Sequence, residues 1–272
     1  MTAGNNNTAL LSLSGVSKSF GGLKAVSEFS LDVARGSITS LIGPNGAGKT
    51  TVFNLITGIY RPDCGAMDFD GTNIMAMNPH RVVEVGIART FQTLRLFENL
   101  TCFENVVAGQ HCRCRAGLIA CLLNTGARRR EEDKAFKLAE DALRRLGIWQ
   151  FRDELAKNLS YGDRRRLEIA RALATVPKLL ILDEPAGGLN ENESNDLMGI
   201  IRDIRDSGVT VFLIEHDMHV VMGISDQVAV MEYGRKIAEG TPEEVQHNPD
   251  VIEAYLGSDD EDEEAAEAGE AV

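Results

Sequence analysis

Residues 43–50 carry the clearest chemical pattern in the sequence. The segment fits G-x-x-x-x-G-K-[ST] at every fixed position and reads Gly43, Pro44, Asn45, Gly46, Ala47, Gly48, Lys49 and Thr50. Glycines let backbone N–H groups point at phosphate oxygens, and the lysine ammonium adds a positive charge. The hydroxyl of Thr50 can bind Mg²⁺. The pattern therefore predicts a phosphate-binding loop, with Thr51 as a further contact to the nucleotide.

Two adjacent acids, Asp183 and Glu184, follow an apolar run and could act on a bound triphosphate. Asp183 can hold Mg²⁺ opposite Thr50, directly or through water. Glu184 can orient an attacking water molecule and accept its proton. Alone, two acids at a strand end would be ordinary solvated side chains. Together with the phosphate loop, they indicate hydrolysis.

Three apolar runs must position these groups. They are Ile38–Ile42, Leu179–Leu182 and Val209–Ile214, and each leads into a polar loop. Runs with little alternation suit strands that are buried on both faces of a parallel sheet. Ligands of open α/β sheets bind at the carboxyl ends of the strands. We therefore expect an α/β fold in which three distant segments converge on one site.

Helices are predicted between the strands. Residues Thr50–Thr57 form a helix that ends at Gly58, and Arg128–Leu146 form an amphipathic helix that ends at Gly147. The apolar face of the second helix contains Ala135, Phe136, Leu138, Ala139, Ala142, Leu143 and Leu146. Residues 93–160 together are predicted to be a helical insertion. Near the end, Thr241–Glu244 is a capping box with proline at the first helical position.

The charge of the chain is concentrated at one end. Its 272 residues carry a net charge of −13, and removing the eight acids of residues 258–272 leaves −5 for the rest. This balance gives no electrostatic case for nucleic acid, and the acidic tail is predicted to be disordered. There is no bilayer-length apolar run and no export pattern, so we expect a cytoplasmic location and a membrane role only through partners.

The cysteines are expected to be reduced thiols, because their number is odd and no export signal precedes them. They are Cys64, Cys102, Cys112, Cys114 and Cys121. The cluster His111-Cys112-Arg113-Cys114 lacks the C-x₂-C pairs of a structural zinc site, which disfavours a metal role.

A resemblance to a known family emerges at Leu159-Ser160-Tyr161-Gly162-Asp163, which is followed by a predicted helix over Arg164–Ala174. The segment resembles the signature of ATP-binding cassette (ABC) ATPases, which usually reads Leu-Ser-Gly-Gly-Gln. The order of phosphate loop, Gln92, signature, acid pair and His216 is also similar. The resemblance covers about residues 10–257 and implies an ABC ATPase domain over residues 9–257. That fold has a RecA-like parallel-sheet core, a small antiparallel β subdomain and an inserted helical subdomain at about 93–160.

The resemblance also implies roles for particular residues. Phe20 matches the aromatic residue that stacks on adenine, although a core phenylalanine is the alternative. Gln92 matches the residue that reaches Mg²⁺ and water and senses the membrane partner. His216 matches the histidine that contacts the γ-phosphate. Ser160 and Gly162 match the signature residues that meet the ATP held by the opposite subunit, so that ATP joins two subunits face to face.

The sequence departs from the family pattern at three positions. Tyr161 replaces the first signature glycine, Asp163 replaces the glutamine, and Asn190 stands where an interface loop usually has aspartate. A carboxylate near phosphate is repulsive, unless Asp163 turns back to cap its own helix with Ser160. Direct phosphate contacts are therefore expected from Ser160 and Gly162 but not from residue 163.

Several segments resemble the ATPase of branched-chain amino-acid importers. They are Gly86–Asn99, Arg166–Arg171, Ile214–Met218 and Asn248–Gly257. The resemblance implies uptake of Leu, Ile or Val, two membrane permease subunits, an indirect periplasmic binding protein and a peripheral position on the cytoplasmic face. It also implies a second ATPase subunit, usually a different chain, with a homodimer as the alternative. Leu94, Leu96 and Phe97 are candidate permease contacts, with core packing as the alternative.

Other functions compete with this interpretation. Urea and amide importers and a lipopolysaccharide exporter use similar ATPases. A soluble nucleic-acid-associated cassette ATPase belongs to a different class, but the single phosphate loop, short insertion and negative charge argue against it. A non-catalytic nucleotide-binding module does not fit the presence of Lys49, Asp183, Glu184 and His216.

Overall fold

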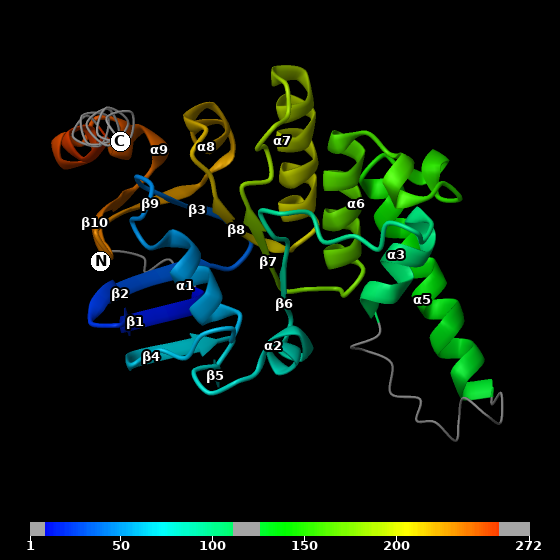
Figure 1. The fold of residues 1–272 in the computed structure, drawn as a ribbon, viewed down its shortest axis with the longest axis horizontal. Coiled ribbons are helices and arrows are strands. Elements are labelled where there is room, and N and C mark those ends of the chain that lie inside the picture. Colours follow the sequence, from blue (N-terminus) through cyan, green and yellow to red (C-terminus); the bar gives the residue numbers. More distant parts are fainter. Residues whose placement is uncertain (1–8, 111–125, 256–272) are drawn as a thin grey trace, which may run out of the picture. The chain divides into compact units, whose positions relative to one another are not determined.

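The computed structural model describes residues 9–110 and 126–255 (Figure 1). The chain divides into two compact units. The first is formed by Met1–Asn78 together with Thr210–Val272, and the second by Pro79–Val209. The residues expected to act on one nucleotide are therefore divided between two units.

An antiparallel sheet begins the first unit, with strand order β2-β1-β4-β5. Its strands are β1 (Ala9–Phe20), β2 (Leu23–Ala34), β4 (Cys64–Phe69) and β5 (Thr72–Asn73). Along β2, the buried residues Phe29, Leu31 and Val33 alternate with exposed ones. This alternation arises because successive side chains of a strand point to opposite faces, so one face of the sheet is covered. The sheet is the small antiparallel element that the family resemblance implies.

A second group of strands in the first unit is mainly parallel. Strand β3 (Ile38–Ile42) pairs in parallel with β8 (Thr210–Ile214) and with β9 (Gln227–Glu232), and β10 (Arg235–Gly240) runs antiparallel to β9. Every residue of β3 and β8 is buried. Two of the three predicted strands are thereby confirmed, and their lack of alternation reflects burial on both faces.

The first unit also contains the helices α1 (Lys49–Ile56), α8 (Met218–Ile224) and α9 (Pro242–Gln246), and residues 249–255 are helical as well. Helix α1 begins and ends one residue earlier than predicted and contacts β2. The predicted capping box of α9 is confirmed, since Thr241 and Glu244 exchange side chain–backbone hydrogen bonds. Residues of β9, α8 and α9 share a buried apolar cluster that includes Val221, Val230 and Val245.

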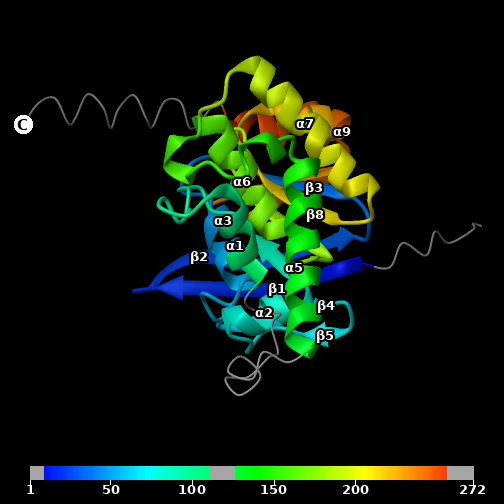
Figure 2. The same ribbon diagram turned by 90° about the vertical axis from the view of Figure 1, so that its right-hand side faces the viewer.

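The second unit combines two parallel strands with helices. Its elements are α2 (Pro79–Val85), β6 (Ile87–Arg89), α3 (Cys102–Gly109), α5 (Gly126–Arg145), the short helices η2 (Trp149–Phe151) and η3 (Ala156–Asn158), α6 (Tyr161–Leu173), β7 (Leu179–Asp183) and α7 (Glu191–Asp206). Strand β6 pairs in parallel with β7. Figure 2 shows α5 beside α3 and α6, which it contacts. The third predicted strand, Leu179–Leu182, is confirmed and extends by one residue.

The long amphipathic helix is confirmed, but the prediction that Phe136 belongs to its buried apolar face is wrong. Helix α5 begins two residues before the predicted start and ends one residue before the predicted end. Ala135, Ala139 and Leu143 are buried, whereas Phe136 is 43% exposed. The Phe136 ring packs on Phe103 of α3, with ring centroids 5.5 Å apart. Periodicity alone could not reveal this position at the margin of the buried stripe.

Some predictions lie outside the described residues. These concern the acidic tail and the cluster of His111, Cys112 and Cys114, together with Cys121. Within residues 9–110 and 126–255, Cys64 and Cys102 are free thiols. In that same part of the chain, no helix combines the length and apolarity that a membrane crossing requires. The boundaries of the helical insertion, residues 93–160, stay a prediction.

Candidate nucleotide-binding site

The phosphate loop lies between β3 and α1 in the first unit. Gly43 and Gly48 have φ angles of 146° and 104°. A Cβ atom at Gly43 would lie 1.9 Å from the carbonyl oxygen of Met231, and one at Gly48 would lie 2.4 Å from that of Ala25. Both positions therefore require glycine, for backbone conformation and for space.

The ammonium group of Lys49 lies within this loop. Its Nζ donates hydrogen bonds of 2.6 Å to the carbonyl oxygen of Gly43 and 2.8 Å to that of Pro44. Lys49 is also the first residue of α1, and the N-terminus of a helix favours an anion. Thr50 is the next residue and is exposed. The loop thus provides a positive charge, a helix N-terminus and an accessible hydroxyl group in one place.

Phe20 and His216, the other candidates in the first unit, lie at the surface. Phe20 ends β1 and is 41% exposed, and its ring packs edge-on against Tyr60 with centroids 5.0 Å apart. A core role does not fit this exposure, whereas stacking on a base does. His216 is exposed two residues after β8, and its backbone N–H donates to the buried Glu215 carboxylate at 3.2 Å.

In the second unit, Asp183 is the last residue of β7 and forms a buried ion pair. Arg89 Nη2 lies 2.6 Å from Asp183 Oδ2, and both side chains are 5% exposed. Arg89 ends the neighbouring strand β6, which brings the two side chains to the same edge. A buried carboxylate needs a countercharge, and its oxygens are also hard ligands that suit Mg²⁺.

Glu184 follows β7 in an uncommon backbone conformation, with a φ angle of 47°. Positive φ is strained for a residue with a side chain, and such strain concentrates at functional sites. The amide Nε2 of Gln92 donates a 2.8 Å hydrogen bond to Glu184 Oε2. The structure therefore brings Gln92, Asp183 and Glu184 together at one edge of the second unit.

The signature segment caps helix α6. Ser160 is the N-cap residue, and its Oγ accepts a 3.1 Å hydrogen bond from the backbone N–H of Asp163. The same hydroxyl group donates a 2.7 Å hydrogen bond to Asp163 Oδ2. Asp163 thus turns back onto Ser160, as the capping interpretation predicts. Ser160 and Gly162 also line a hollow of about 140 Å³.

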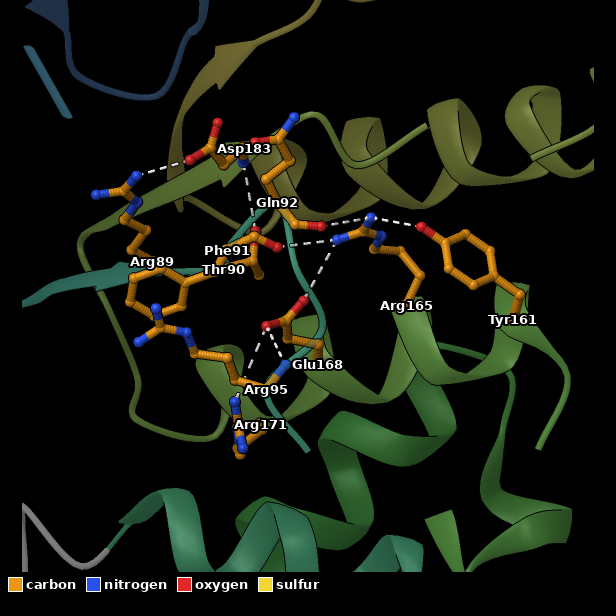
Figure 3. Close-up of polar contacts among 10 residues, drawn as sticks. All are labelled: Arg89, Thr90, Phe91, Gln92, Arg95, Tyr161, Arg165, Glu168, Arg171 and Asp183. Atoms are coloured by element: carbon orange, nitrogen blue, oxygen red, sulfur yellow. Dashed lines mark hydrogen bonds and ion pairs between the residues drawn. The ribbon is translucent and has the colours of Figure 1, made fainter. Parts of the chain in front are cut away.

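Residues that the sequence analysis missed form a buried polar network on α6 (Figure 3). Arg165 and Glu168 are each 2% exposed. Arg165 Nη1 donates to the carbonyl oxygen of Phe91 at 3.0 Å, and Nη2 donates to that of Gln92 at 3.2 Å. Arg165 and Glu168 lie three residues apart and so share one face of the helix, but this spacing is equally typical of an exposed ion pair and gave no signal of burial.

Charge and burial compete within this network. Burial raises the pKa of the Glu168 carboxyl, although Arg165 and Arg171 oppose the shift. Burial likewise lowers the pKa of Arg171, which Glu168 opposes. Arg165 Nη1 lies 3.5 Å from Glu168 Oε2, and the backbone N–H of Arg95 donates to Oε1 at 3.4 Å. The charges are therefore paired, as buried charges must be.

Comparison with protein families defines the class. A family described as "ABC transporter" matches residues 26–187. A second family, "Branched-chain amino acid ATP-binding cassette transporter", matches residues 235–261. The chain belongs to the ABC transporter family and is an ATP-binding ATPase of the cassette fold.

Particular relatives place the chain more closely within this family. The high-affinity branched-chain amino acid transport ATP-binding protein LivG of Salmonella typhimurium is 47% identical over 249 residues, which are 91% of this chain and 98% of LivG. The corresponding protein BraF of Pseudomonas aeruginosa is 46% identical with the same coverage. The crystal structure of a nucleotide-free ATP-binding cassette from an ABC transporter matches with a TM-score of 0.80 and 32% identity, covering 91% of this chain and 99% of that one.

Proposed function

We propose that this chain hydrolyses ATP to drive a branched-chain amino-acid importer. The observation that carries the proposal is the identity of 46–47% to LivG and BraF across 91% of the chain. The lipopolysaccharide export ATP-binding protein LptB of Haemophilus influenzae is 35% identical over a similar length. This difference favours import over export as the process that the ATPase serves.

We propose that Thr50, Gln92 and Asp183 are the residues that would hold Mg²⁺. Hydroxyl, amide and carboxylate oxygens are ligands that Mg²⁺ prefers. The Gln92 Nε2–H donates a hydrogen bond to Glu184 Oε2, so Oε1 of the same amide is the atom that would bind the metal. A Mg²⁺ ion held by these three residues would supply positive charge to offset that of the phosphates.

Within this proposal, hydrolysis uses one general base and two side chains that contact the γ-phosphate. Glu184 accepts a proton from the water that attacks the γ-phosphate. Lys49 and His216 stabilise the charge of the γ-phosphate, and Phe20 stacks on adenine. The loop residues Gly43, Asn45, Gly46, Ala47, Gly48, Thr50 and Thr51 surround the phosphates. The positive charge of Lys49 beside the N-terminus of α1 supports this assignment.

We propose that two ATPase subunits share each nucleotide. One subunit supplies the phosphate loop and the acids, and the other supplies Ser160 and Gly162 from its signature. The hollow beside these two residues at the start of α6 supports this arrangement. A different second ATPase chain is expected, two permease subunits complete the assembly, and a periplasmic binding protein delivers the solute.

The assembly places the chain peripherally on the cytoplasmic face of the membrane. Phe97 is 53% exposed, which supports a contact with a permease better than core packing does. Leu94 and Leu96 are partly buried and can contribute at its side. The insertion at about residues 93–160 would then carry the contact surface.

Uptake measurements test the transport function. Deleting the gene is expected to abolish high-affinity uptake of labelled Leu, Ile and Val, and the wild-type chain should restore it while Lys49→Ala should not. Glu140→Gln, a change in an exposed ion pair on α5, is the matched control and should restore uptake fully. Unchanged uptake of all three amino acids after deletion, with loss of urea or amide uptake, would overturn the solute assignment.

The hydrolytic role is tested by Glu184→Gln in the purified full chain. This variant should bind MgATP as tightly as wild type, lose hydrolysis by about 10²-fold or more, and accumulate as an ATP-bound dimer. Size-exclusion chromatography with and without ATP detects the dimer. Wild-type turnover in this variant would contradict the role of Glu184 as the base.

A further inference from the structure

Arg165 joins two functional segments of the second unit. It lies on α6, one turn after Tyr161, the first residue of that helix. Its Nη2 donates a 2.9 Å hydrogen bond to the hydroxyl group of Tyr161 and a 3.2 Å hydrogen bond to the carbonyl oxygen of Gln92. Its Nη1 donates to the carbonyl oxygen of Phe91 at 3.0 Å. Figure 3 shows the guanidinium group between the helix and the Gln92 segment.

Only arginine can make this set of contacts. A guanidinium group is planar and presents several N–H donors in a fixed fork, so two different nitrogens reach two consecutive carbonyl oxygens. A lysine ammonium is a single point and cannot occupy both positions. Because Arg165 is almost fully buried, its loss would leave these carbonyl oxygens without this donor and would remove one of the cations beside the Glu168 carboxylate.

The same helix holds the Gln92 segment at a second point. Glu168 accepts a hydrogen bond from the backbone N–H of Arg95 at 3.4 Å. At the first of these points, the Phe91 ring also lies near the guanidinium carbons of Arg89 and Arg95, which are 5.1 and 4.2 Å from its centroid. The backbone from Phe91 to Arg95 is thus fixed to α6 by hydrogen bonds at both ends.

We propose that Arg165 is a positioning residue for ATP hydrolysis. It fixes the backbone of Gln92 on the signature helix, which keeps the Gln92 amide within hydrogen-bond distance of Glu184. The Tyr161 hydroxyl orients Arg165 from the start of the same helix. The inference rests on the proposed function, because it assigns Arg165 a part in the hydrolytic step that Glu184 performs.

Arg165→Gln, Arg165→Lys and Tyr161→Phe test the inference in the purified full chain. Arg165→Gln is expected to lower kcat about 10- to 100-fold, since displacing a catalytic group by about 1 Å can cost that much. Arg165→Lys should lower kcat nearly as strongly although it keeps the charge, and Tyr161→Phe should lower it about two- to fivefold. The KM for ATP should stay within about threefold in all three, because the phosphate loop is unchanged.

A matched control separates positioning from general stability. Arg81→Gln changes an arginine of α2 in the exposed Arg81–Glu84 ion pair, and it should leave kcat and the melting temperature unchanged. A double-mutant cycle with Gln92→Ala supplies the decisive readout. If Arg165 acts through Gln92, Arg165→Gln should lower kcat by less than about twofold in the Gln92→Ala background.

Two results would overturn the inference. The first is a folded Arg165→Gln variant whose kcat is within twofold of the wild-type value. The second is a double variant whose loss of kcat equals the product of the losses that Arg165→Gln and Gln92→Ala cause singly. If Arg165→Gln does not fold, wild-type kcat in both Arg165→Lys and Tyr161→Phe overturns it instead. If the proposed function itself were wrong, the results would differ from these. The wild-type chain would not hydrolyse ATP, or the Lys49→Ala and Glu184→Gln variants would hydrolyse it at the wild-type rate.

Discussion

Arg89 Nη2 lies 2.6 Å from Asp183 Oδ2, and water reaches little of either side chain. The carboxylate that we propose as a magnesium ligand therefore already has a buried cation as its partner (Figure 3). A metal ion bound there would compete with Arg89 for this carboxylate. Removing either partner would leave an uncompensated buried charge in the second unit, and the pair sets the charge that a metal ion would meet.

Arg89→Met should destabilise the nucleotide-free chain by about 3–5 kcal/mol, because it leaves the Asp183 carboxylate buried without its countercharge. Saturating MgATP should recover more stability in the variant than in wild type, since the metal replaces the missing positive charge. Denaturant unfolding with and without MgATP measures both effects. Arg81→Met, which breaks the exposed Arg81–Glu84 pair, is the control and should cost less than about 1 kcal/mol. Equal losses in the two variants would contradict a structural role for the buried pair.

Asp163→Asn should strengthen the ATP-dependent dimer. Ser160 Oγ now donates its hydrogen to Asp163, and the carboxylate adds a negative charge beside the signature. Removing one charge near a bound phosphate is worth about 1 kcal/mol for a 4 Å separation screened as in bulk water, or roughly a fivefold lower dissociation constant. Sedimentation of the Glu184→Gln chain with and without Asp163→Asn measures this constant. Asp153→Asn, at a strongly exposed position, is the control. A weaker dimer in Asp163→Asn would show that the cap matters more than the charge.

The sequence predicted what depends on local patterns. The phosphate loop is a contiguous motif, the buried strands Ile38–Ile42 and Leu179–Leu182 read as apolar runs, and the cap at Ser160 follows from its spacing to Asp163. Each of these features is decided by residues close together in the chain, where propensity and geometry act directly.

Contacts between distant residues could not be predicted in the same way. Arg165 and Glu168 look like solvated charges on a helix, and only the neighbouring Gln92 segment turns them into a buried network. The Arg89–Asp183 pair depends on which strand lies beside β7. Tertiary packing decides such contacts, so they were missed although every residue was visible in the sequence.

Cys102 should resist alkylation that modifies Cys64. Burial raises the pKa of the Cys102 thiol from 9.0 to about 11, whereas Cys64 is exposed. At pH 8, this shift lowers the fraction of Cys102 present as the reactive thiolate about 100-fold. Raising the pH to 9 increases that fraction only about tenfold. Iodoacetamide labelling followed by peptide mass spectrometry compares the two rates, which should converge in guanidinium chloride. Equal rates in the folded chain would contradict the burial of Cys102.

Phe20→Ala should weaken ATP binding about 5- to 30-fold, because stacking of an aromatic ring on a base contributes roughly 1–2 kcal/mol. Phe20→Trp keeps a stacking surface and should bind within about threefold of wild type. Phe136→Ala is a matched control, since Phe136 and Phe20 are 43% and 41% exposed but Phe136 lies on α5 in the other unit. Titration with a fluorescent ATP analogue measures the three dissociation constants. If Phe20→Ala binds as tightly as Phe136→Ala, the ring does not stack on adenine and its exposure needs another explanation.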